Sequence, residues 1–185
     1  RILSSAASDV YKRQEQGASH MADGYARVTG KPGVVVCDSD TSGTNTITGL
    51  QTANMDSAPI VVFICHFSED DKLSNVFNQI DHIGISRSTT KHNFLVEDVM
   101  DLSRIVREAL YLSVTGRPGA ILVDIPKHVL FSEYKFNFPK IDKVSGYSIP
   151  KEAKISDINK AANLIMKAKR PIVFGGGGIC YFRSN

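Results

Sequence analysis

The chain has 185 residues, 42% of them hydrophobic and 22% charged, which is the ordinary composition of a globular protein. Its net charge is only +3 and its 22 lysines and arginines are scattered, which argues against the concentrated basic patch of a nucleic-acid-binding surface. No apolar run approaches the roughly 20 residues that span a bilayer, so we expect neither a nucleic-acid nor a membrane partner.

The start of the chain does not read as part of a fold. Residues 4–14, SSAASDVYKRQ, resemble the translation of a sequencing-library adapter, so we expect residues 1–14 to be a non-native tail. Residues 15–28, EQGASHMADGYARV, then predict a helix, because Gly30 follows as a left-handed cap and Pro32 lies beyond it.

Short apolar runs predict the strands of a sheet. Each is rich in β-branched residues and bounded by residues that favour turns, as buried strands are. The runs are GVVVC (33–37), PIVVFIC (59–65) and AILVDIP (120–126), with KHNFL (91–95) as a shorter candidate.

Helices and loops alternate with these runs. Residues 46–55 predict a helix, and residues 97–115 predict another because their apolar side chains recur close to helical period. The polar composition of residues 38–45 and 66–75 predicts loops. Strands that are apolar on both faces and alternate with helices predict an α/β fold with a doubly wound parallel sheet.

The domain organisation follows from a change in composition. We expect one domain over 15–135, a linker rich in Pro, Lys and Ser over 136–154, and the start of a second α/β domain over 155–185. In that second part, residues 155–168 predict an amphipathic helix, and PIVFGGGG (171–178) predicts a strand and a loop.

The number and spacing of the cysteines indicate whether the cellular compartment is reducing or oxidising. Cys37 and Cys65 each end an apolar run, so we expect them to be buried. With Cys180 they make an odd number without metal-ligand or disulfide spacing. This favours a reducing compartment, and we expect a cytoplasmic protein.

Four stretches in order resemble the large subunit of acetolactate synthases, a family of thiamine-diphosphate enzymes. EQGASHMADGYARVTGKPGVV resembles the segment with the catalytic glutamate, and TNTITGLQTANMDSAPIVV resembles the helix and strand that follow it. KHNFLVEDV with TGRPGAILVDIPKHV resembles the end of the pyrimidine-binding domain, and KRPIVFGGGGI the start of the central domain. The resemblance implies an N-terminal fragment with a pyrimidine-binding domain that is truncated at its own N-terminus.

The resemblance implies a catalytic and cofactor-binding role for Glu15. In the family, the equivalent carboxylate hydrogen-bonds a ring nitrogen of the cofactor's aminopyrimidine and favours the imino tautomer, which takes a proton from the thiazolium carbon. Composition alone would make Glu15 a solvated residue at a helix N-terminus. Asn45 is a further candidate for cofactor binding.

Other positions match the family less directly. Phe77, Asn78 and Lys91 fall where the substrate channel is expected, although surface solvation explains Lys91 equally well. Gly176 and Gly177 are candidates for binding flavin adenine dinucleotide (FAD), although a tight turn also explains the glycine run.

Several loop residues depart from the family pattern. The family has Gly-Pro-Gly where this chain has Asp40, Thr41 and Ser42, so the loop must take another path. His66 replaces a glutamine, and Asn78 stands where a glutamine is expected. These changes fall in loops that should face cofactor or substrate.

The resemblance implies a thiamine-diphosphate-dependent carboligase that decarboxylates pyruvate and transfers the two-carbon unit to a 2-oxo acid in branched-chain amino-acid biosynthesis. The expected cofactors are thiamine diphosphate, Mg²⁺ with ligands outside this sequence, and FAD. The expected assembly is a homodimer or homotetramer with the cofactor at the subunit interface, with or without a regulatory small subunit. We expect this chain alone to be inactive. Two alternatives stay open: another 2-oxo acid enzyme, of the sulfoacetaldehyde acetyltransferase or decarboxylase type, or a non-catalytic association module.

Overall fold

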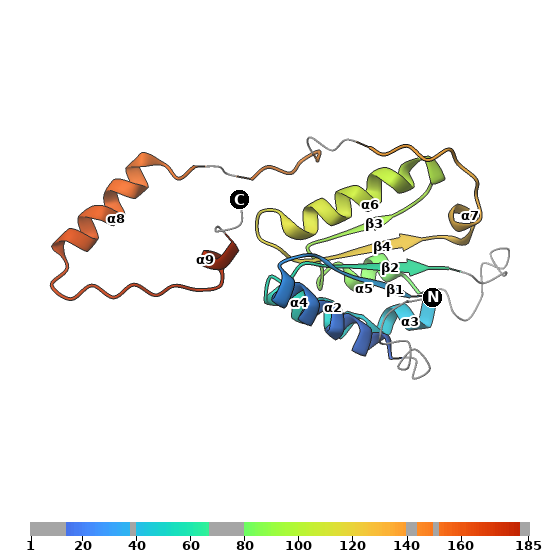
Figure 1. Cartoon of the computed structure of the whole chain (residues 1–185), viewed down its shortest axis with the longest axis horizontal. Helices are drawn as coiled ribbons and strands as arrows, with labels where there is room; N and C mark the ends of the chain where they lie inside the picture. The colour runs from blue at the N-terminus through green and yellow to red at the C-terminus, as the bar shows by residue number, and fades with distance from the viewer. Residues whose placement is uncertain (1–13, 38–39, 67–79, 140–143, 150–151, 182–185) are drawn as a thin grey trace. The chain divides into compact units, whose positions relative to one another are not determined.

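The structure of the chain is a computed structural model that describes residues 14–37, 40–66, 80–139, 144–149 and 152–181. The chain separates into two compact units, Arg1–Val144 and Ser145–Asn185. The first unit contains a sheet with helices against it, and the second contains two helices among its described residues (Figure 1).

A four-stranded parallel sheet forms the centre of the first unit, in the order β1-β2-β4-β3 (Figure 1). Every neighbouring pair is parallel, with Gly33 opposite Ile60 and Ile60 opposite Ala120. The strands are β1 (Gly33–Cys37), β2 (Ile60–Cys65), β3 (His92–Leu95) and β4 (Ala120–Ile125). The predicted parallel α/β sheet is confirmed.

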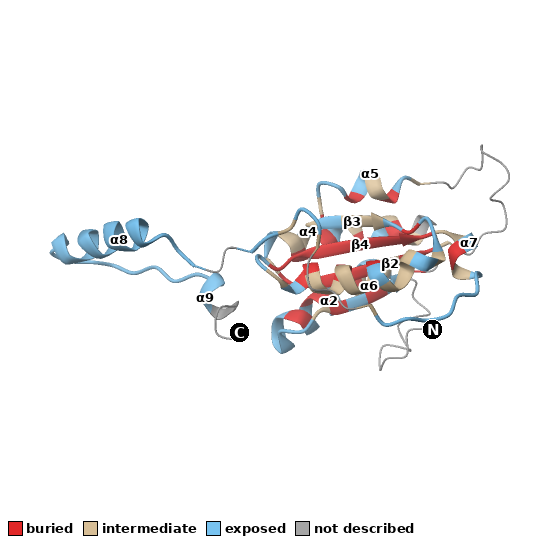
Figure 2. Ribbon diagram, turned by 90° about the horizontal axis from the view of Figure 1, so that it is seen from above, coloured by how far each residue is buried: buried red, intermediate tan, exposed pale blue. Residues whose placement is uncertain are grey.

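Helices cover both faces of this sheet. On one face, α2 (Glu15–Thr29) and α4 (Ile47–Met55) pack on β1, β2 and β4, while α6 (Val99–Val114) lies on the other face, as Figure 1 shows. Figure 2 shows that buried residues follow the strands and the inner sides of the helices. The first unit's short helices are α3 (Asp40–Asn45), α5 (His82–Ser86) and α7 (Lys127–Leu130).

The core lies between the sheet and the α2–α4 layer. Ala22 and Ala26 of α2 and Leu50 and Ala53 of α4 pack there against apolar side chains of β1, β2 and β4. Small residues on the helices allow them to approach the sheet closely, which suits the bulky β-branched side chains of the strands. This burial of apolar area is the main force that holds the unit together.

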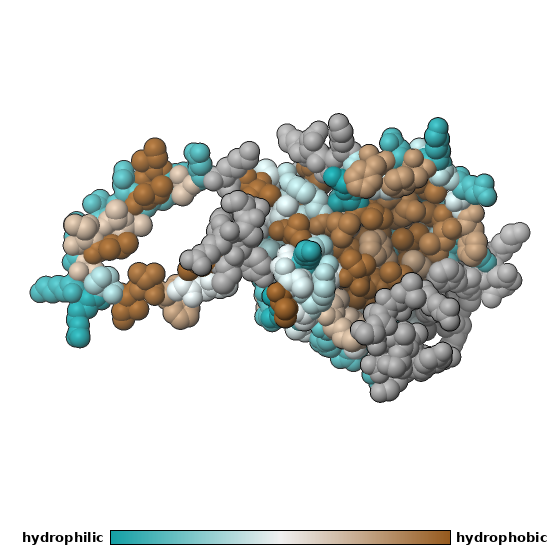
Figure 3. Space-filling model, in the orientation of Figure 1, coloured by the Kyte–Doolittle hydropathy of each residue, from teal (hydrophilic) through white to brown (hydrophobic). Residues whose placement is uncertain are grey.

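Strand β1 is covered on one face only. Gly33, Val35 and Cys37 are buried, whereas Val34 and Val36 point to the other face and are exposed. The helix on that face, α6, packs mainly on β4, with β2 and β3 beside it. In the view of Figure 3, hydrophobic residues gather over the sheet of the first unit.

Charged and polar groups fix the ends of the helices. Gly30 ends α2 with φ of 69°, and its N–H donates to the Ala26 carbonyl at 2.9 Å, so the predicted left-handed cap is confirmed. Arg27 near the same end donates to Asp23 at 2.9 Å and to Asp56, just beyond α4, at 2.7 Å. These hydrogen bonds raise the pKa of Arg27 and join the ends of the two helices.

Two sequence expectations were wrong. Residues 40–45 form α3 and not a loop, because the packing of this segment against α2, α4, α5 and β2 overrides its loop-like composition. Residues 171–174, expected as a strand, form no strand and are exposed. A strand needs a hydrogen-bonding neighbour, and the described part of the second unit contains none.

The second unit has α8 (Ile155–Lys167), close to the predicted helix 155–168, and α9 (Gly178–Tyr181). All of its residues from 152 to 179 are exposed, including the apolar side chains of α8. Across the described ranges of both units, no helix is both long and apolar enough to cross a membrane.

Candidate cofactor site

The candidate site lies at the carboxyl edge of the parallel sheet. All four strands run in the same direction and therefore end at one edge, at Cys37, Cys65, Leu95 and Ile125. Helix α2 precedes β1 and runs back along the sheet, so its first residue, Glu15, lies at this edge (Figure 1). In open α/β sheets, ligands bind outside the carboxyl ends of the strands.

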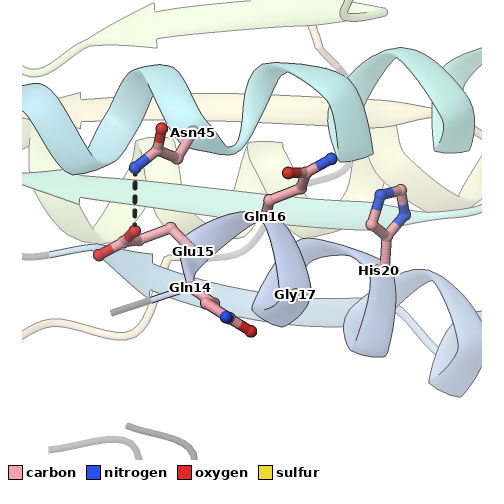
Figure 4. A pocket seen from close by; sticks show the side chains of 6 residues that line it. All are labelled: Gln14, Glu15, Gln16, Gly17, His20 and Asn45. Carbon is pink, nitrogen blue, oxygen red and sulfur yellow. Dashed lines mark hydrogen bonds between the residues drawn. The ribbon is translucent and has the colours of Figure 1, made fainter. Parts of the chain in front are cut away.

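The structure brings together two of the residues that the sequence singles out, Glu15 and Asn45. The Asn45 side-chain amide at the end of α3 donates a hydrogen bond to Glu15 Oε2 at 3.2 Å, although 30 residues separate them. Figure 4 shows the Glu15 carboxylate turned toward Asn45. Glu15 is half-buried, so its carboxylate remains accessible to a ligand, while the hydrogen bond from Asn45 fixes its orientation.

A pocket with a volume of about 460 Å³ opens beside this pair. Its lining residues, which are mostly polar, come from the first turns of α2 and the end of α3 (Figure 4). The lining residues are Gln14, Glu15, Gln16, Gly17, His20 and Asn45. The first turn of α2, whose backbone N–H groups have no partner within the helix, borders the same region, which favours a polar ligand.

Close packing of α2 holds Glu15 in place. A Cβ at Gly49 of α4 would lie 2.0 Å from Ser19 Oγ, so only glycine allows α4 to approach α2 at this point. The Ser19 hydroxyl itself donates to the Gln16 carbonyl at 2.7 Å, inside the first turns of α2. The close contact with α4 therefore limits the movement of α2, the helix that carries Glu15.

Lys91 lies away from this site. It immediately precedes β3 and therefore stands at the opposite, amino edge of the sheet. Its ammonium donates to the carbonyls of Leu112 at 2.5 Å and Thr115 at 2.7 Å, at the end of α6. These hydrogen bonds cap the C-terminus of α6, and the place of Lys91 in a substrate channel stays a prediction.

The neighbours of Lys91 in the KHN motif also have structural contacts. The Asn93 amide donates to the Ile83 carbonyl at 3.0 Å and to Ser86 Oγ at 3.2 Å, which ties β3 to α5. The His92 ring stands edge-on to Phe94, with 4.5 Å between centroids, and burial lowers the pKa of His92.

We expect Lys91→Met to destabilise the protein by about 2 kcal/mol, because two carbonyls at the end of α6 lose a charged donor. The full-length protein should show a lower thermal midpoint, while KM for its substrate stays unchanged. Lys127→Met is the matched control, because the Lys127 ammonium lies over the exposed Phe131 ring, 5.9 Å from its centroid. A Lys91→Met protein of unchanged stability but raised KM would restore Lys91 to the substrate channel.

The remaining candidates are two pairs of residues, one of which the structure does not describe. Phe77 and Asn78 lie outside the described residues. Gly176 and Gly177 are exposed in the second unit, and a Cβ at either would meet no atom within 4 Å. In the described ranges, no group of three or more His, Cys, Asp or Glu side chains is arranged to hold a metal ion.

Known proteins similar to this chain belong to one group of enzymes. Residues 7–85 match the family described as thiamine pyrophosphate enzyme, N-terminal TPP binding domain. An acetolactate synthase large subunit of Buchnera aphidicola subsp. Schizaphis graminum is 44% identical over 169 residues, which is 90% of this chain and 30% of that protein.

Acetolactate synthases of two other organisms are also similar to this chain. The acetolactate synthase of Mycobacterium leprae is 42% identical over 170 residues, 92% of this chain and 27% of that protein. The chloroplastic acetolactate synthase 3 of Brassica napus is 37% identical over 177 residues, 95% of this chain and 27% of that protein. The chain thus spans about 30% of the length of the curated relatives that it matches first.

The N-terminal domain of thiamine pyrophosphate enzymes is thus the family that residues 7–85 match, and the parallel sheet with helices on both faces is consistent with that domain. Within the family, its sequence is similar to acetolactate synthase large subunits over about nine-tenths of its length.

Proposed function

We propose that this chain is the pyrimidine-binding part of a thiamine-diphosphate-dependent carboligase of the acetolactate synthase type. The complete protein would decarboxylate pyruvate and transfer the two-carbon unit to a second 2-oxo acid, in the biosynthesis of branched-chain amino acids. The observation that carries the proposal is the Glu15 carboxylate, directed by Asn45 beside a polar pocket at the carboxyl edge of the sheet.

The residues at this pocket suit the aminopyrimidine of thiamine diphosphate. The ring nitrogen of an aminopyrimidine needs a group that can share a proton with it, and its amino substituent needs polar partners. Glu15, Asn45 and the neighbouring glutamines supply carboxylate and amide groups for both. When bound, the cofactor supplies the carbon centre that attacks 2-oxo acids.

Glu15 would hold a proton at the ring nitrogen that it faces, and Asn45 would keep the carboxylate in the direction that this requires. The tight contact of α2 with α4 near Ser19 and Gly49 would limit the movement of Glu15. A fixed carboxylate needs little reorganisation during proton transfer, which is how preorganised groups lower a barrier.

Several finer features are part of this proposal. Mg²⁺ and the diphosphate would be bound by residues outside this chain, and FAD would be bound by the domain to which Gly176 and Gly177 belong. The protein would be a cytoplasmic homodimer or homotetramer, with or without a regulatory subunit, and the pocket at Glu15 would face a neighbouring subunit. This chain alone would have no activity.

The test uses the full-length protein with thiamine diphosphate, Mg²⁺ and FAD. We expect acetolactate from pyruvate, and mixed products when a second 2-oxo acid is added. Release of CO2 without a carbon–carbon bond would favour a decarboxylase. Absence of thiamine diphosphate binding in calorimetry would overturn the proposal and leave an association module.

A further inference from the structure

An arginine holds the end of α4 at the amino edge of the sheet, opposite the edge where the pocket lies. Residues 54–57 end α4 and lead toward β2. Arg117, three residues before β4, donates to the Met55 carbonyl at 2.9 Å and to the Asn54 carbonyl at 3.4 Å. Its Nε donates to Ser57 Oγ, also at 2.9 Å. The last carbonyls of a helix lack a partner further along it, and here one guanidinium supplies donors to two of them.

The backbone of this turn is constrained. Ser57 has φ of 61°, in the left-handed region that costs a residue with a Cβ more than it costs glycine. The Ala58 N–H donates back to the Ala53 carbonyl at 2.8 Å, which is the pattern that ends a helix around a left-handed residue. The hydrogen bond from Arg117 to the Ser57 hydroxyl therefore stabilises a turn whose backbone conformation is unfavourable for serine.

The same turn is joined to two other elements of the unit. Arg27 at the end of α2 donates to Asp56 at 2.7 Å. A Cβ at Gly119, directly before β4, would lie 2.7 Å from Asn54 Oδ1, so the turn also lies close to the start of that strand. The end of α4 is thus held both to the sheet and to α2, the helix that carries Glu15.

Helix α4 connects this turn to the pocket. It has nine residues, or about 13 Å, and its N-cap is Thr46. Thr46 donates to the Gly43 carbonyl of α3 through its hydroxyl at 2.7 Å and its N–H at 3.1 Å, so α3 and α4 are joined without a loose linker. Asn45, directly before Thr46, donates to Glu15 at 3.2 Å. Because rigid elements transmit displacement between sites, a shift of the turn at 54–57 shifts the amide that directs Glu15.

We propose that Arg117 is a positioning residue for Glu15. By holding the end of α4 at one edge of the sheet, Arg117 sets the place of Asn45 at the other edge, and Asn45 directs the carboxylate. The inference rests on the proposed function, because it concerns the rate of the reaction in which Glu15 would take part.

The experiment is a double-mutant cycle in the full-length protein, with kcat for acetolactate formation measured well below the thermal midpoint. Arg117→Met should lower kcat by about tenfold, because a misplacement of about 1 Å caused far from the reacting atoms can cost on the order of 10²-fold. Asn45→Ala should lower kcat as well. Adding Arg117→Met to Asn45→Ala should change kcat by less than about twofold, since the connection is already absent. A merely structural role would give the same fold loss in both backgrounds.

Arg104→Met is the matched control, because Arg104 donates to Asp101 at 2.8 Å and to Glu108 at 3.1 Å within α6, on the opposite face of the sheet. It removes a guanidinium with two partners and should leave kcat unchanged. Arg117→Lys keeps the charge but lacks the planar fork, so its kcat should lie between those of the wild type and Arg117→Met.

If Arg117→Met does not fold, Arg117→Lys takes its place in the cycle. Equal losses in the two backgrounds, or a wild-type kcat in the Arg117 variant, overturn this inference and leave the proposed function intact. A wild-type protein that forms no acetolactate overturns the proposed function, and the inference with it.

Discussion

Replacement of Glu15 by glutamine should lower kcat of the full-length protein by about 10²- to 10⁴-fold, the range that a positioned proton-transfer group contributes. Glutamine keeps the size of the side chain and its hydrogen bond with Asn45 but cannot share a proton. Acetolactate formation at saturating pyruvate and thiamine diphosphate gives the measurement. Cofactor affinity should change much less, because the diphosphate would be bound elsewhere.

Two controls make this result specific. Glu133→Gln removes an exposed carboxylate of the same unit and should leave kcat unchanged. Glu15→Asp keeps the negative charge, but its side chain is one methylene shorter. Its kcat should therefore lie between those of the wild type and Glu15→Gln. A Glu15→Gln protein with wild-type kcat would mean that the carboxylate has no part in proton transfer, and the pocket beside it would lose its assignment.

Most of the fold could be predicted from the sequence, because the central strands share one sequence pattern. The runs at 33–37 and 120–126 are apolar, β-branched and bounded by turn residues, and both are strands of the sheet. Helix α3 was missed because DTSGTN has loop-forming residues, and its helix is held by contacts from α2, α4, α5 and β2 that no local pattern reveals. Tertiary packing decides such short segments.

The sequence identifies site residues that lie in one continuous motif, but it does not reveal contacts between residues that are far apart along the chain. Glu15 came from a motif that is continuous in sequence, whereas the contact of His66 with Asp124 joins residues 58 positions apart. Only the pairing of β2 with β4 creates that contact. The KHN motif that contains Lys91 is also continuous in sequence, but a motif alone does not reveal at which edge of the sheet its residues lie.

Substitution at Gly33 should destabilise the fold more than substitution at any exposed glycine. A Cβ there would lie 2.2 Å from the Ala22 carbonyl oxygen, which belongs to the backbone of α2 and cannot rotate away. Gly33→Ala should therefore cost about 3 kcal/mol, the upper part of the usual range for overpacking, and Gly33→Val should cost more. The shift of α2 away from β1 should also displace Glu15, so activity should fall together with stability.

Thermal unfolding and soluble yield of the full-length protein measure this effect, with a fall of several degrees expected for Gly33→Ala. Gly24→Ala is the matched control in α2, because Gly24 is exposed and a Cβ there meets no atom within 4 Å. Alanine is the better helix former by up to about 1 kcal/mol, so this control should be as stable as wild type or more stable. Equal midpoints for the two variants would show that α2 does not pack on β1 as closely as the 2.2 Å approach requires, and the support for Glu15 from the sheet would be lost with it.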